Sequence, residues 1–451
     1  MKRVHMHFFK HCVPALLVIT SLSMAQHSAP EGRERGFVLY EAINVPSPDT
    51  TFARIDILYR IDSDFFVPVK NSDPDLPWSF VRRGELLVEL IDTAGISSAR
   101  SIRPIQIGSD VSDSSPENKR WHSGIVSLTA PAGKYTIVLE IDDRESNRKF
   151  LDRSMEVSAR RFSPSVFDLS SPVTIRWPSD QTRSMELRPE NLGGNILFGE
   201  RAAIWVMLAS RRDTMPFHVS YTLESRSTSG ATAETSLRDS TGDVIVLKGQ
   251  PKLSGDSLSY SLTEDRAEIT SLIVPFPAQK LPLRRFELTL VVQQGTSRKE
   301  IKKSMSVLWP QMPLSLKDVD YALNALRYIT REEELDSLKR GSYEVRRQNL
   351  ETFWRARDTD TTSALSSVMA EYYRRVDYAA RNFSTLRDPD GSRTDRGKIY
   401  ILHGPPTKIE RSLNPTAGFR ESWSYAGIGK QFIFVDESKS GNYTLLTTRT
   451  L

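Results

Sequence analysis

The chain has 451 residues, 39% of them apolar and 26% charged, with 61 basic and 56 acidic side chains. These are the proportions of an ordinary globular protein, and the near balance of charge gives no electrostatic reason to expect nucleic acid as a partner. The one cysteine is Cys12. A disulfide framework and a thiolate zinc site are therefore excluded, and core burial must hold the fold together.

The first 25 residues have the three parts of a secretory signal. A positive start precedes an apolar run of about a dozen residues, shorter than the roughly 20 that span a membrane, and a small-x-small cleavage site follows. We expect cleavage near Ala25/Gln26, a secreted or periplasmic protein, no lipid anchor and no transmembrane segment in the mature chain. The pattern consists of Lys2, Arg3 and Lys10, then Val13–Met24, then Ser23, Met24 and Ala25.

Without this leader the chain has 426 residues and a net charge of +2, because the leader holds three basic and no acidic residues. This length predicts roughly three domains of about 150 residues each. We place them at residues 36–162, 163–310 and 311–451.

Residues 36–162 alternate between apolar and polar with a period of two, which predicts antiparallel strands with one buried and one wet face. Short strands with regular turns favour an Ig-like β-sandwich. The clearest runs are Ile55, Ile57, Tyr59 and Ile61, then Leu86, Val88 and Leu90, then Tyr135, Ile137, Leu139 and Ile141.

Residues 163–310 show the same period, and we expect a second sandwich. The last hairpin of each segment is similar in sequence, with Met155 and Met305 lying 150 positions apart, so we predict that one module was duplicated. The polar stretch Ser225–Asp243 is expected to be an exposed loop.

From residue 311 the period becomes helical. We expect about four helices and then a small antiparallel sheet, an α+β domain in which helices cover one face of the sheet. Ser315 with Asp318 is expected to begin the first helix, and Thr330 with Glu333 to cap the second. The predicted strands are Lys398–Leu402, Glu421–Tyr425, Gln431–Val435 and Tyr443–Thr447.

Residues 391–410 read Gly-Ser-Arg-Thr-Asp-Arg-Gly-Lys-Ile-Tyr-Ile-Leu-His-Gly-Pro-Pro-Thr-Lys-Ile-Glu. This resembles the signature of the GWxTD-domain family of exported bacterial proteins. The resemblance covers the C-terminal third of the chain, and it implies leading β-sandwiches but no assigned reaction. One departure is Ser392, which stands where the family has tryptophan. The candidate binding residues are Gly391, Arg393, Thr394, Asp395, Arg396, Gly397, Tyr400, His403, Gly404, Pro405, Pro406, Trp423 and Tyr425.

Physically, this motif has the composition of a tight turn that leads into a strand stopped by two prolines. A binding role would use Arg393 and Arg396 as anion contacts, with Tyr400 and His403 lining the same loop. A calcium site at Asp388, Asp390 and Asp395 is opposed by the two arginines.

No catalytic apparatus is recognisable. The glycines from Gly194 to Gly199 are followed by Glu200 and Arg201 where a phosphate loop needs Lys and Ser or Thr. His218 lies on the polar side of a predicted strand. We therefore expect a non-catalytic envelope protein without cofactor or metal, whose C-terminal domain docks a protein or envelope polymer. The alternatives are a secreted hydrolase with its site at the Asp395–His403 loop, and carbohydrate binding through exposed aromatics such as Trp78, Trp121 or Trp205.

Overall fold

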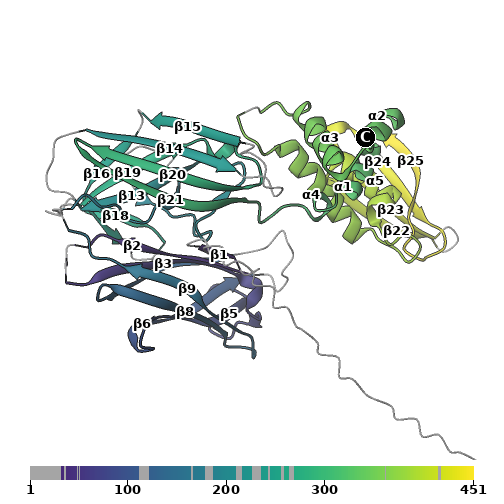
Figure 1. The fold of residues 1–451 in the computed structure, drawn as a ribbon. Helices are drawn as coiled ribbons and strands as arrows, with labels where there is room; N and C mark the ends of the chain where they lie inside the picture. The colour runs from purple at the N-terminus through teal and green to yellow at the C-terminus, as the bar shows by residue number, and fades with distance from the viewer. Residues whose placement is uncertain are drawn as a thin grey trace, which may run out of the picture.

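The computed structural model describes residues 32–34, 37–47, 49, 51–110, 121–163, 166–177, 186–209, 216–225, 235–241, 244–254, 258–263, 269–360, 362–414 and 418–451. The predicted signal and its cleavage site at Ala25/Gln26 lie outside these ranges. The fold class is as expected: two antiparallel β-sandwiches stack on each other, and an α+β domain follows beside the second (Figure 1).

The first sandwich consists of two antiparallel sheets. Its core lies between them and includes Tyr40, Ile57, Val88 and Ile137, each fully buried. One sheet contains β1 (Gly32–Glu34), β2 (Val38–Val45), β3 (Ala53–Asp62) and β7 (Trp121–Ala130). The other contains β4 (Val69–Lys70), β5 (Phe80–Asp92), β6 (Ser97–Ser109), β8 (Gly133–Asp143) and β9 (Lys149–Ala159).

The second sandwich has two main sheets and a small third one. The first main sheet contains β10 (Val173–Arg176), β13 (Ala202–Ala209), β19 (Ile269–Phe276) and β16 (Ile245–Lys248). The second contains β12 (Ile196–Leu197), β21 (Ser297–Leu308), β20 (Arg285–Gln294), β14 (Phe217–Ser225) and β15 (Thr235–Thr241). The small sheet contains β11 (Glu186–Leu187), β18 (Tyr260–Thr263) and β17 (Gln250–Leu253). Strand β15 lies within the stretch predicted to be a loop, and His218 is exposed as expected.

The two sandwiches share a third apolar core between them. In β3, Ile57 faces the core of the first sandwich and Leu58 faces the shared core. In β13, Ile204 faces the core of the second sandwich and Trp205 faces the shared core. The expectation of one wet face is therefore wrong for the sheet that holds β2 and β3. Its polar-looking face is covered by the second sandwich, so the four main sheets form four layers.

Over its described residues, the C-terminal domain has five α-helices and one four-stranded antiparallel sheet. Helices and sheet share a core that includes Trp354, Tyr373, Trp423 and Phe434. The helices are α1 (Val319–Ala325), α2 (Glu332–Leu338), α3 (Tyr343–Arg355), α4 (Ser367–Asn382) and α5 (Asp395–His403). The sheet order is β22 (Lys408–Asn414), β23 (Gly418–Tyr425), β24 (Lys430–Asp436) and β25 (Thr444–Thr450). No helix among the described residues has the length and apolarity needed to cross a membrane.

Helices α1 and α2 do not begin in the way that the sequence predicted. Helix α1 begins after Asp318, which accepts hydrogen bonds from Asp320 N and Tyr321 N, whereas Ser315 lies in a separate 3-10 helix (Leu314–Leu316). Thr330 does not cap α2, because its hydroxyl donates to the carbonyl of Leu326 instead.

The α+β domain is attached to the second sandwich at two apolar points. Trp309 follows β21, lies 5.4 Å from the ring of Phe198 and packs against the cores of both the second sandwich and the C-terminal domain. Leu365, in the segment between α3 and α4, packs against the core of the second sandwich. Its neighbour Ala364 donates its backbone N–H to the carbonyl of Gln279 at 2.7 Å.

Candidate functional site: the signature residues

The signature begins where three backbone segments come together. Gly391 opens a short 3-10 helix (Gly391–Arg393), and a Cβ atom there would lie 2.3 Å from the carbonyl oxygen of Ala379 at the end of α4. A Cβ atom on Gly397, in the first turn of α5, would lie 2.1 Å from the carbonyl oxygen of Gly391. Both positions require glycine because the backbones approach too closely for a side chain.

The signature threonine begins helix α5. The hydroxyl of Thr394 accepts a hydrogen bond from Gly397 N at 3.1 Å and donates one to the carbonyl of Gly391 at 2.8 Å. This is an N-cap, which satisfies a backbone donor that the helix leaves free. The predicted turn and strand at Lys398–Leu402 are therefore wrong: the segment is helical, and Ile399 and Ile401 are buried in the core of the domain.

The signature aspartate reaches the last strand of the sheet. Asp395 lies in the first turn of α5, where a negative charge is favoured by the helix dipole. Its Oδ2 atom accepts a hydrogen bond from the backbone N–H of Leu445 in β25 at 2.7 Å. The aspartate thus connects the start of α5 with the start of β25.

The signature arginine points to the same part of the chain. Arg396 donates to the carbonyl of Gly441 at 3.3 Å, and its guanidinium lies 4.3 Å from the centre of the Tyr443 ring. Its side chain is 14% exposed and lies 3.9 Å from the buried carboxylate of Glu421. Burial lowers the pKa of Arg396 below its ordinary value, and the Glu421 charge opposes that shift. The guanidinium of Arg396 is therefore already in contact with groups of its own domain.

Glu421 joins the arginine to the aromatic core. It is 2% exposed and accepts hydrogen bonds from the indole Nε1 of Trp423 at 2.6 Å and from Arg411 Nε at 3.0 Å. A buried carboxylate of this kind needs partners that offset its lost hydration. Trp423 is itself 1% exposed and lies 5.0 Å from the ring of Phe434.

Ser392, at the position of the family tryptophan, is buried in a polar cluster. Its hydroxyl donates to Asp390 Oδ1 at 2.6 Å and lies 3.2 Å from the hydroxyl of Tyr321. The Tyr321 hydroxyl also donates to Asp390 at 3.0 Å, and the Tyr328 hydroxyl donates to the carbonyl of Ser392 at 2.8 Å. Two tyrosines and a carboxylate therefore surround the serine. No pattern in the sequence indicates that Tyr321 and Tyr328, which lie 71 and 64 residues upstream, meet this position.

The remaining signature residues form the far end of α5. Tyr400 stacks on Tyr378 with ring centres 4.4 Å apart. His403 stacks on Phe432 at 5.3 Å, and burial, with help from Lys430 and Arg375, lowers its pKa. Gly404 ends the helix with a positive φ of 75° and accepts a hydrogen bond from the hydroxyl of Tyr425 at 2.9 Å. Pro405 is exposed and Pro406 half-buried in the segment before β22.

Asp395 and His403 do not meet. They occupy the first and last positions of the nine-residue helix α5, which at 1.5 Å per residue separates them by about 12 Å. The predicted Asp395–His403 loop is therefore a helix, because Thr394 caps it and the domain core buries one of its faces. A catalytic pair formed by these two side chains is incompatible with this geometry.

The two arginines that were predicted to contact an anion differ in their exposure to solvent. Arg393 is exposed and pairs with Asp390 at 3.2 Å, whereas Arg396 is largely buried. The carboxylates proposed for calcium have different partners, since Asp390 contacts Ser392 and Asp395 contacts Leu445. A cavity of about 400 Å³ lies elsewhere, at the junction with the second sandwich. Its lining residues are Gly199, Arg201, Gln279, Asp360, Thr362 and Ser363.

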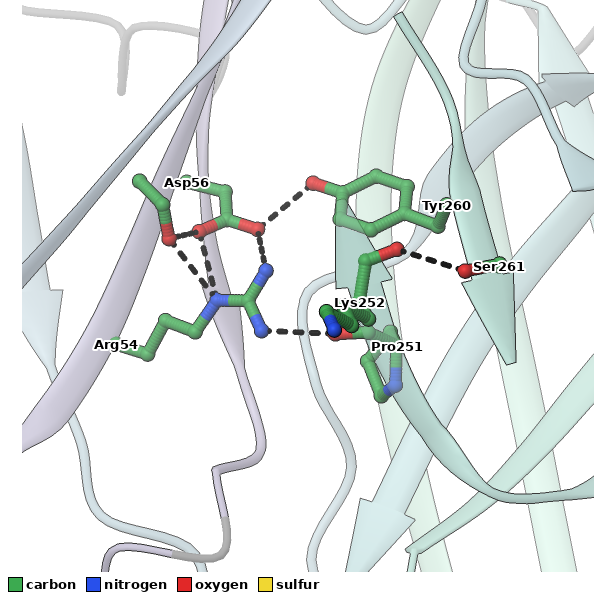
Figure 2. A network of polar contacts seen from close by, with 7 residues as sticks. Arg54, Asp56, Pro251, Lys252, Tyr260 and Ser261 are labelled. Atoms are coloured by element: carbon green, nitrogen blue, oxygen red, sulfur yellow. Dashed lines mark hydrogen bonds and ion pairs between the residues drawn. The ribbon is translucent and has the colours of Figure 1, made fainter. Parts of the chain in front are cut away.

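A second polar cluster, which the sequence did not predict, lies between the sandwiches (Figure 2). Asp56 is fully buried and accepts hydrogen bonds from Arg54, Ser127 and the hydroxyl of Tyr260. Arg54 also donates to the carbonyl of Pro251 at 2.9 Å. The strand hairpin β17–β18 of the second sandwich thereby holds β3 of the first.

The tryptophans weighed for carbohydrate binding differ in exposure. Trp205 is fully buried 5.0 Å from the ring of Tyr260, and Trp121 is half-buried under the guanidinium of Arg60. Trp78 is 36% exposed and lies directly over Gly108, where a Cβ atom would meet its ring at 1.8 Å.

The comparisons agree with the signature. Residues 289–450 match the model of the GWxTD domain, so the C-terminal part of the chain is a GWxTD domain. The match begins within β20 and thus takes in the last hairpin of the second sandwich as well as the α+β domain.

No curated protein matches the chain. Two solved structures are each 6% identical to it. One, titled BspA_C_WT, covers 59% of this chain and 99% of its own, with a TM-score of 0.15. The other, the crystal structure of collagen adhesin (CNA) from S. aureus, covers 58% and 93%, with a TM-score of 0.14. At these scores neither bears on the fold or the function.

Proposed function

We propose that this chain is an exported, non-catalytic protein of the bacterial cell envelope, and that its GWxTD domain docks a protein partner. The observation that supports the proposal is how the polar signature side chains are used. Thr394, Asp395 and Arg396 each bond to the domain's own backbone, at Gly397, Leu445 and Gly441. Residues committed in this way shape a surface, and a reaction would need polar groups directed into a cleft.

The sandwiches suit a supporting role in this proposal. Their four layers present a rigid body, and the α+β domain is held to it by Trp309 and Leu365. The predicted signal segment supports export. A secreted or periplasmic location follows from that segment alone.

The experiment is site-specific photo-crosslinking in cells that express the full chain with its leader. A photoreactive residue replaces Leu386 or Arg393, both exposed beside the signature, or Ile96, which is 63% exposed on the first sandwich. We expect crosslinks to an envelope protein from the first two positions and none from Ile96. Crosslinks from Ile96 alone, or from no position, would contradict docking by the GWxTD domain.

The hydrolase alternative is tested separately on the purified protein. A hydrolytic activity that disappears in both Asp395→Asn and His403→Gln, while each variant remains folded at the assay temperature, would replace the non-catalytic proposal. Recovery of the chain in the cytosolic fraction would contradict the export part only.

A further inference from the structure

The sheet of the GWxTD domain has two edge strands that differ in their protection. At one edge, β22 carries Lys408, Glu410 and Arg411, with Lys408 paired to Glu410 at 2.7 Å and Arg411 to Glu421 at 3.0 Å. Charged side chains on an edge prevent another strand from adding to it. At the other edge, β25 reads Thr-Leu-Leu-Thr-Thr-Arg-Thr and has a single charge, Arg449.

Strand β25 is open along the side that faces away from β24. Within the described residues its one strand partner is β24, and every side chain in it is exposed except the half-buried Thr447. Leu446 is 56% exposed. Strong β-formers without lysine or proline on an open edge form a template for strand pairing.

The backbone direction along β25 follows from two hydrogen bonds. Leu451 N donates inward to the carbonyl of Gly429, whereas Leu445 N donates to Asp395 on the other side. Because successive residues of a strand direct their backbone groups to opposite sides, Thr448 and Thr450 present theirs outward. The register shift between Ile433 and Phe434 skips Leu446, and this brings the N–H of Leu445 to the outward side as well. Asp395 occupies the outward N–H at the start of the strand, so pairing is confined to the part that follows.

This strand is complementary to itself. In an antiparallel pair centred on Thr448, Thr448 meets its own copy, Thr447 meets Arg449, and Thr450 meets Leu446 at the register shift. No like charges lie opposite each other, and the threonines pair favourably across strands. A shift by one residue would place inward-directed groups opposite outward-directed ones.

We infer that two copies of this chain associate through β25, joining their four-stranded sheets into one continuous sheet with a two-fold axis at Thr448. This goes beyond the proposed function, because it concerns a second copy and is independent of whether another protein docks. The signature aspartate has a part in it, since it fixes where the pairing strand begins.

The first test measures the association of residues 26–451 by sedimentation equilibrium. We expect a dimer whose dissociation constant rises at least about tenfold in Leu446→Lys, because a charge on the edge disfavours strand pairing. The matched variant is Ile409→Lys, at a residue 46% exposed on the other edge of the same sheet. It should change the dissociation constant less than about twofold.

The second test fixes the register by disulfide formation, since residues 26–451 contain no cysteine. Thr448→Cys places two thiols about 5 Å apart by Cα, within disulfide range, whereas two Thr450→Cys residues would be about 14 Å apart. We expect an oxidised dimer only for Thr448→Cys. A monomeric wild type, equal crosslinking of both variants, or equal effects of Leu446→Lys and Ile409→Lys would each overturn the inference.

Discussion

The carboxylate of Asp395 accepts the backbone N–H of Leu445 at 2.7 Å across fifty residues of sequence. This contact explains why the signature aspartate follows a capping threonine: Thr394 starts the helix, and the next residue is thereby directed at the sheet edge.

Replacing Asp395 with alanine should destabilise the domain by about 1–2 kcal/mol, because Leu445 loses its acceptor and the helix loses a favourable charge. Urea unfolding measures the loss, and amide exchange at Leu445 should become faster. The matched control is Asp336→Ala, at an exposed position on α2, which should leave both unchanged. Equal effects of the two variants would count against a specific role for the contact.

Introducing the family tryptophan, Ser392→Trp, should destabilise this protein by roughly 1–3 kcal/mol. Ser392 is 4% exposed, and the Tyr321 hydroxyl lies 3.2 Å from its side chain, so a larger residue would overpack the site. Removing that ring should create room. The double variant Ser392→Trp/Tyr321→Ala should therefore be more stable than the sum of the two single changes predicts. Simple additivity would show that the tyrosine does not take the tryptophan's space.

Gly199→Ala should loosen the attachment of the C-terminal domain. Gly199 has a φ of 79°, and a Cβ atom there would lie 2.4 Å from that of Leu365. Gly95 has a φ of 81° with nothing within 4 Å, so Gly95→Ala carries the backbone cost of about 1–2 kcal/mol alone. Only Gly199→Ala should speed proteolytic cleavage between residues 356 and 366. Equal cleavage in both variants would contradict the contact's role.

Lys303→Met should cost about 3–5 kcal/mol in unfolding free energy. The Lys303 ammonium lies 2.8 Å from Glu41, each side chain is 1% exposed, and removing one partner leaves a buried charge. The double variant Glu41→Met/Lys303→Met should recover much of that loss. Lys149, paired with Asp142 on the surface, offers the control, and Lys149→Met should change stability little. A double variant no better than Lys303→Met would contradict the argument.

The protein should lose stability as the pH rises above about 10. Burial raises the pKa of Tyr59 to about 12, and burial together with Asp56 raises the pKa of Tyr260 well above its ordinary value. The unfolded tyrosine titrates near 10, so the folded state holds more protons above that pH and stability falls. For Tyr59 the loss accumulates between about pH 10 and 12. Urea midpoints across this range test it, and Tyr260→Phe should flatten the dependence.

The period-two runs predicted the strands because alternation records which face a side chain occupies. The same rule is wrong for β3, because it predicts that Asp56 faces solvent. That carboxylate is buried because Tyr260, 204 residues later, donates to it. A buried polar residue resembles an exposed one in sequence when its partner is that distant.

The helix α5 was missed for a related reason. The run from Lys398 to Leu402 is short and rich in β-branched and aromatic residues, which is typical of a strand, and Gly397 disfavours a helix. The sequence pattern predicts that Thr394 and Asp395 belong to a tight turn, although a threonine followed by an acidic residue is also a helix start. The decisive factor is the close approach of Gly397 to Gly391, which is tertiary. The importance of Leu445 and Glu421 to the signature likewise depends on contacts between α5 and the sheet.

The shared core between the sandwiches has a mechanical consequence. Any separation of the two sandwiches would expose Trp205 and the Asp56 cluster to water. The two sandwiches are therefore packed rigidly and are not free to bend about a flexible linker. Packed sheets lie about 10 Å apart, and the four layers therefore span roughly 30 Å from the outermost sheet to the one nearest the GWxTD domain. Because Trp309 and Leu365 attach the GWxTD domain to the second sandwich, a force applied to the first sandwich would reach that domain through one continuous packed body.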